Sequence, residues 1–134
     1  MTMPTVNYSD KWGECLIRPV DGCSEIRWFD TTSGMDGDDF NAFLSEFAAT
    51  VEVSGLPGAL VDAVQFAMDM SKMTMGWRDE NIIPRYNAAG LSKFAFVMPK
   101  GMPAIGAPPA AEGPAQFPTA YFATRAEALS WLAE

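Results

Sequence analysis

The side chains best suited to chemistry lie between positions 62 and 86. Asp62 stands in the otherwise apolar stretch GALVDAVQF. The segment WRDENIIPRY then places four larger side chains within ten residues: Trp77, Arg78, Arg85 and Tyr86. A guanidinium group presents parallel N–H donors that match a carboxylate or a phosphate, so this segment is a candidate site for an anionic ligand. The alternative is a solvated helix face.

Asp62 admits two interpretations. A carboxylate buried without a partner is strongly unfavourable, so it needs a counter-ion or access to water. In a functional site, Asp62 would act as an acid or an anchor in a pocket, with Arg78 or Arg85 as its counter-ion. In the structural alternative it forms a salt bridge or lies at a capped helix end, because ion-pair networks hold carboxylates without any catalysis.

A methionine-rich stretch follows the Asp62 segment. Met68, Met70, Met73 and Met75 alternate there with polar residues. Methionine is unbranched and pliable, which suits adaptable binding surfaces as well as irregular gaps in a core. We therefore expect Met70 and Met73 to line an apolar ligand pocket or a subunit interface, with core packing as the alternative. Three residues of the next strand and loop would enlarge this patch: Met98, Met102 and Ile105.

Composition argues against several classes of function. The 134 residues contain no histidine, which removes Ser-His-Asp and Cys-His arrangements and leaves lysine or carboxylate bases. No glycine-rich phosphate fingerprint precedes a helix. The formal net charge of −8 disfavours nucleic acid and anionic membranes, because such binding requires clustered Lys and Arg. We expect no cofactor and no nucleic-acid partner.

The two cysteines and the hydropathy pattern bear on the compartment. Cys15 and Cys23 flank LIRPVDG, a predicted hairpin tip, so their side chains could face each other across two strands. No CxxC spacing suggests a metal site. We find no secretion signal and no run of apolar residues long enough to span a bilayer. The expectation is therefore a cytoplasmic protein with two reduced thiols and no integral membrane association.

The element pattern is that of an α/β protein. Residues 14–20 and 23–30 are rich in β-formers around the turn Asp21-Gly22. Asp36 is the expected N-cap of a helix with an apolar stripe, and Thr124 that of the last helix. The remaining elements are predicted strands over 58–66, 93–99 and 119–124 and a helix over 77–90, with the Pro/Gly-rich stretch 100–118 as loop. The order is β-β-α-β-α-β-β-α in a single domain, residues 1–134.

The ending YFATRAEALSWL resembles the closing strand and helix of the SpoIIAA-like proteins, a branch of the STAS/SEC14-like α/β superfamily. The strands GALVDAVQF and KFAFVMP are similar to that family's central strands. The resemblance implies a small mixed sheet of four to five strands with helices packed against it, often without catalysis, and in its lipid-carrying members an apolar pocket. The counterparts of the family's phosphorylated serine segment are Asp69 and Ser71, with Lys72 where glycine is usual.

Together these observations favour a non-enzymatic binding or protein-interaction module. It would hold a small apolar or anionic ligand, or present a homodimer or protein-partner face near the methionine-rich stretch. The alternative is a small-molecule enzyme in which Asp62 acts as acid or base and Arg78 or Arg85 binds an anionic substrate.

Overall fold

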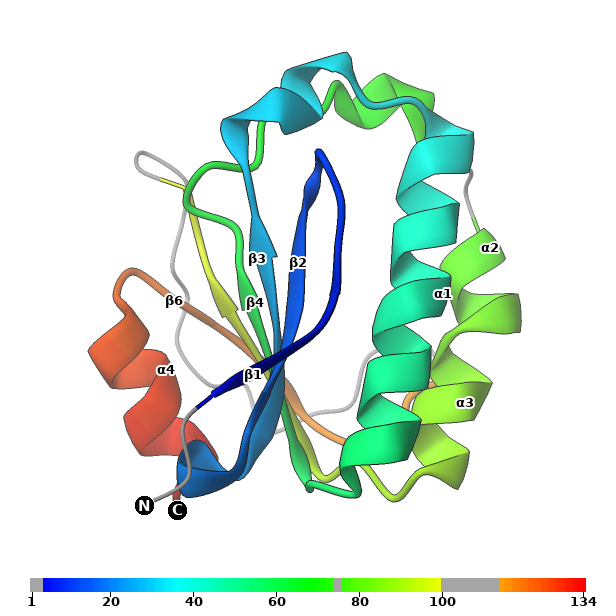
Figure 1. Ribbon diagram of the computed structural model, residues 1–134. Helices are drawn as coiled ribbons and strands as arrows, with labels where there is room; N and C mark the ends of the chain where they lie inside the picture. The colour runs from blue at the N-terminus through cyan, green and yellow to red at the C-terminus, as the bar shows by residue number, and fades with distance from the viewer. Residues whose placement is uncertain (1–3, 74–75, 100–113) are drawn as a thin grey trace.

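The fold is α/β, built on a mixed sheet whose strands lie side by side in chain order (Figure 1). The computed structural model describes residues 4–73, 76–99 and 114–134. The first three strands pair antiparallel, and the third to the sixth pair parallel. The six strands are β1 (Thr5–Ser9), β2 (Gly13–Arg18), β3 (Cys23–Trp28), β4 (Gly58–Asp62), β5 (Lys93–Val97) and β6 (Thr119–Phe122).

The sheet has six strands, not the predicted four to five, because β1 was missed. This strand lies at the edge of the sheet and is mostly exposed. Its pairing with β2 shifts register between Val6 and Tyr8. The Val6 side chain is half exposed to solvent. An exposed edge strand lacks the apolar alternation that makes an inner strand visible in a sequence.

Helices cover the two faces of the sheet unequally (Figure 1). Three helices lie on one face: α1 (Gly37–Ser54), α2 (Trp77–Asn81) and α3 (Ile83–Ala88). The last helix, α4 (Arg125–Leu132), packs on the other face against β4, β5 and β6. The β4-to-β5 passage therefore forms the βαβ unit that the sequence predicted.

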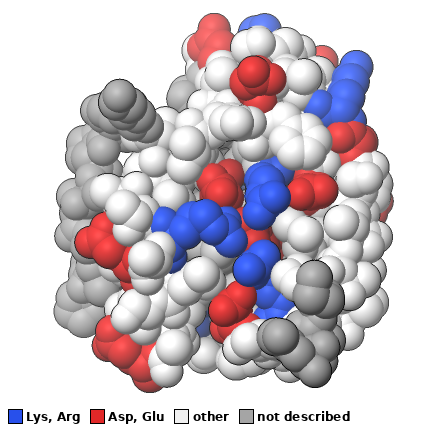
Figure 2. Space-filling view, turned by 60° about the vertical axis from the view of Figure 1, so that its left-hand side comes forward, with Lys and Arg blue, Asp and Glu red and all other residues white. Residues whose placement is uncertain are grey.

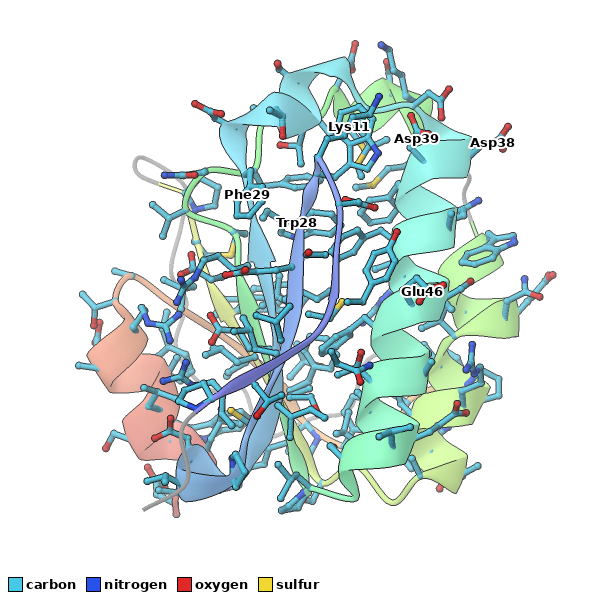
Figure 3. The ribbon with its side chains drawn as sticks, viewed as in Figure 1. Lys11, Trp28, Phe29, Asp38, Asp39 and Glu46 are labelled. Atoms are coloured by element: carbon cyan, nitrogen blue, oxygen red, sulfur yellow. The ribbon has the colours of Figure 1, made fainter. Side chains whose placement is uncertain are left out.

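Helix α1 begins where the sequence predicted. Asp36 accepts a hydrogen bond from the backbone N–H of Asp39, whose carboxylate accepts one from the Asp36 N–H in return. Figure 3 shows Asp38 and Asp39 at this end of α1, where the helix dipole favours negative charge. The expected apolar stripe packs on the sheet, with Phe43 and Phe47 almost fully buried.

The single helix predicted over 77–90 is instead two short helices. The break falls at Ile82, the C-cap of α2 and the N-cap of α3, with Pro84 in the first turn of α3. A proline ring clashes with the carbonyl four residues earlier and offers no N–H, so an unbroken helix cannot pass through it. Helix α2 begins after Gly76, which has a φ of 81°.

Of the Pro/Gly-rich stretch 100–118, residues 100–113 lie outside the described residues. Its last part is described: Ala115 and Phe117 are buried against the core that α1, α2 and α3 cover. The side chain of Asn87 holds this part in place, because its amide donates to the Pro114 carbonyl and its oxygen accepts from the Gln116 N–H.

The two cysteines point to opposite faces of the sheet. Cys15 lies opposite Ile26 and packs in the core under α1, whereas Cys23 lies opposite Arg18 and packs under α4. The prediction that their side chains could face each other is therefore wrong. The alternation of side chains along paired strands separates them, and both are free thiols.

Glu25 of β3 anchors the α4 side of the sheet. Its side chain is fully buried and contacts three arginines. Nη1 of Arg125 lies 2.6 Å from Oε2 of Glu25, and the same Nη1 lies 2.9 Å from Oδ2 of Asp62. Arg18 and Arg27 approach the Glu25 carboxylate to 3.3 and 3.9 Å. Figure 2 shows basic and acidic side chains interleaved on this side of the molecule.

We expect Glu25→Gln to lower the free energy of unfolding by about 3 kcal/mol, because the guanidinium groups around it lose a buried counter-charge. Urea denaturation followed by circular dichroism measures the loss. The matched control is Glu52→Gln, which removes an exposed pair with Arg85 and should cost less than about 1 kcal/mol. Equal losses in the two variants would contradict a central role for Glu25.

We also expect both thiols to be inert in the folded protein. Burial raises the pKa of Cys15 and of Cys23 to about 12. The raised pKa stabilises the fold fully below the ordinary thiol pKa, and this contribution is lost as the pH rises toward the folded value. Ellman's reagent should titrate two thiols only after denaturation. Rapid reaction of either thiol in the native protein would show that its side chain opens to solvent.

Candidate functional site

A cavity of about 390 Å³ lies on the face of the sheet that α1, α2 and α3 cover. This volume falls in the range of small-molecule binding sites. The cavity is lined by residues of β3, α1, β4, α2, α3, β5, β6 and their connections: Ile26, Trp28, Phe40, Asn41, Leu44, Val61, Ala63, Phe66, Met73, Gly76, Arg78, Tyr86, Phe94, Phe96, Met98, Pro99 and Tyr121.

One wall of the cavity is a cluster of aromatic rings around Trp28. The Trp28 ring stacks with Phe40 of α1 at 5.8 Å between centroids and lies 5.1 Å from Phe66. Figure 3 shows Trp28 between the sheet and α1. These rings form a rigid apolar surface, because aromatic side chains have few rotamers and pack in offset or tilted geometries.

A second aromatic wall comes from the parallel strands. Phe94 and Phe96 alternate on β5 and so point to the same face, with their centroids 5.1 Å apart. Phe96 stacks on Tyr121 of β6 at 5.1 Å, and Tyr86 of α3 lies 5.6 Å from Phe94. The cavity is therefore bordered by two sets of rings held on different elements.

The segment after β4 is held across this face by backbone hydrogen bonds. The N–H of Ala63 donates to the Val97 carbonyl at 2.9 Å, and the N–H of Ala67 donates to the Thr32 hydroxyl at 2.8 Å. Thr32 is itself fully buried. These bonds fix Phe66 and place Ala63 in the cavity wall.

Two polar groups of the lining stand out, one on α3 and one on α2. The Tyr86 side chain is almost fully buried, and its hydroxyl has no hydrogen-bond partner among the described residues. Complete burial raises its pKa, and the positive charge of Arg78 opposes part of that rise. Cζ of Arg78 lies 5.5 Å from the centroid of Phe94, which places the guanidinium over that ring.

The structure brings three of the predicted site residues together. Met73, Arg78 and Tyr86 all line the cavity. Met73 also packs against the core, as does Met68, which is buried. Part of the methionine-rich stretch thus contributes to an apolar cavity.

The other predicted site residues lie elsewhere. Asp62, the last residue of β4, points to the α4 side and forms a salt bridge with Arg125. The structural interpretation of Asp62 is therefore confirmed, and its counter-ion is Arg125, not Arg78 or Arg85. Arg85 instead binds Glu52 of α1, with Nη2 2.6 Å from Oε1. Successive side chains of a strand point to opposite faces of the sheet. Because Val61 lines the cavity, Asp62, the next residue of β4, points away from it.

Two further predicted residues do not line the cavity. Trp77 is partly buried and packs against the same core without entering the lining. The side chain of Met70 lies outside the described residues, as do Met75, Met102 and Ile105. Asp69 accepts hydrogen bonds from the N–H and hydroxyl of Ser71, which lower the pKa of Asp69.

Apart from Tyr86, the aromatic lining residues were not singled out from the sequence as site residues. Phe94 and Phe96 carried a signal, because the alternation in KFAFV places both on one face of a strand. Trp28 and Ile26 alternate in the same way on β3. The alternation of apolar and polar residues along a strand identifies its buried face but does not tell whether other side chains fill the space above that face. No pattern in the sequence therefore predicted the cavity.

No group of three metal-ligating side chains gathers anywhere in residues 4–73, 76–99 and 114–134. None of the helices in these ranges combines the length and the apolar character needed to cross a bilayer. Compared with family models, with curated proteins and with solved structures, the chain matches none.

Proposed function

We propose that this protein is a small-molecule binding module that takes an apolar ligand into the cavity between the sheet and α1, α2 and α3. Its resemblance to the SpoIIAA-like branch of the STAS/SEC14-like domains is part of the proposal. The order of elements in the β3-to-α4 region agrees with that resemblance. A partner protein, a homodimer and a cytoplasmic location stay predictions from the sequence.

The observation that carries the proposal is the unpartnered hydroxyl of Tyr86 in the wall of an apolar cavity. A buried hydroxyl without a hydrogen bond is unfavourable, and native proteins hold very few such groups. Phenylalanine would fill the same space without that cost. A tyrosine at this position is explained if a ligand oxygen or nitrogen completes its hydrogen bonding.

The size of the cavity supports the same conclusion. Apolar surface that faces an open pocket stays in contact with water, and a ligand that covers it removes that surface from water and gains dispersion contacts. This chain has abundant large apolar residues, yet leaves about 390 Å³ between two aromatic walls. A ligand with a flat or flexible apolar body would make those contacts.

Binding is better supported than turnover. The enzyme alternative needed Asp62 beside Arg78 or Arg85, and these side chains lie in separate places. Within the described lining, Arg78 is the one charged side chain. Acid–base chemistry requires a proton donor or acceptor that titrates near neutral pH, and the raised pKa of Tyr86 moves it further from that range.

We expect the protein to bind the neutral fluorescent probe N-phenylnaphthylamine saturably, and Ala63→Phe to weaken that binding about tenfold or more, because a phenyl ring then occupies the cavity. Fluorescence titration measures both affinities. Val20→Phe is the matched control, since Val20 is 68% exposed in the turn between β2 and β3 and remote from the cavity. Similar affinities in the two variants would place the probe outside the cavity.

Tyr86→Phe should stabilise the free protein by about 1 kcal/mol, because it removes a buried hydroxyl that has no partner. Urea denaturation without ligand measures the change. The control is Tyr8→Phe, which removes a hydroxyl that donates to Asp10 at 2.7 Å and should not be stabilising. A loss of stability in Tyr86→Phe would mean that its hydroxyl is already satisfied and would remove the main support for a ligand.

A further inference from the structure

Arg78 differs from every other arginine of the chain. The sequence contains five arginines, and four of them pair with carboxylates, in the pairs Arg18–Asp21, Arg27–Glu14, Arg85–Glu52 and Arg125–Glu25. Arg78 has no carboxylate partner among the described residues. In an acidic protein with a formal net charge of −8, an arginine without one is unusual.

The guanidinium of Arg78 is also placed where a ligand would reach it. It lies over the Phe94 ring in the cavity wall and is partly buried. A cation–π contact with a ring takes up none of the N–H hydrogen bonds of a guanidinium, so its donors can still pair with an acceptor. A planar pair of donors at the wall of an apolar cavity matches a carboxylate, which accepts two parallel hydrogen bonds.

Tyr86 contacts the same phenylalanine. Its ring centroid is 5.6 Å from that of Phe94, and the Arg78 guanidinium carbon is 5.5 Å from it. Burial raises the pKa of the Tyr86 hydroxyl, and the positive charge of Arg78 opposes part of that rise, which is consistent with the two groups lying near each other. The two polar groups thus lie near one aromatic ring of the same cavity wall and can serve one ligand.

Resting on the function proposed above, we propose that the ligand is an amphipathic monocarboxylate whose carboxylate pairs with Arg78 and whose apolar body lies against the aromatic walls. An oxygen of the same molecule accepts the hydrogen bond of the Tyr86 hydroxyl. A single guanidinium matches a single negative charge. A phosphate would call for more positive charge than the described lining supplies.

The test compares carboxylates with uncharged amides of the same shape. Isothermal titration calorimetry measures naphthylacetate against naphthylacetamide, and phenylhexanoate against phenylhexanamide. We expect each carboxylate to bind about tenfold tighter than its amide, because only the carboxylate forms a charge-assisted pair. Arg78→Met should abolish this preference. Arg78→Lys should keep part of it and serves if the methionine variant does not fold.

The control is Arg85→Met, the loss of a nearby helix arginine that pairs with Glu52 outside the cavity. It should leave the carboxylate preference intact. Equal binding of acids and amides, or no binding of either while N-phenylnaphthylamine still binds, would overturn the monocarboxylate proposal and leave the binding module standing. Failure of all five compounds to bind would overturn both proposals.

Discussion

The ion network around Glu25 is the constraint on which the rest of this structure depends. A fully buried carboxylate is tolerated only with close counter-charges, and here the arginines that supply them come from β2, β3 and α4. Arg125 also joins Asp62 of β4 to the same network. One carboxylate therefore ties the start of α4 to the middle of the sheet.

Because of this network, the two faces of the sheet carry different kinds of side chain. The inner charges of β3 and β4, including Asp62, gather on the α4 side, where they neutralise one another. The opposite face is left almost wholly to aromatic and aliphatic side chains, among them Trp28 and Phe94. Arg78 reaches that apolar face from α2, and among the described residues it has no carboxylate partner.

Much of the fold was accessible from the sequence, because local signals specify it. The Asp36 cap, the parallel strands β4 and β5 and the helix after Thr124 all follow from nearby residues. The partner of Asp62 was not accessible, since Arg125 lies 63 residues away and on the other side of the sheet from Arg78. The cavity also escaped prediction, because an unfilled space is a property of packing between elements.

The chain-order arrangement of the strands has a consequence for how the protein folds. Each strand pairs with the strand that precedes it in the sequence, so the sheet can grow by adding one neighbour at a time, with modest loop-closure entropy at each step. Glu25 enters early in that growth, yet Arg125 follows 100 residues later. Until α4 docks, Glu25 lacks its closest counter-charge, so we expect the docking of α4 to complete this network late in folding.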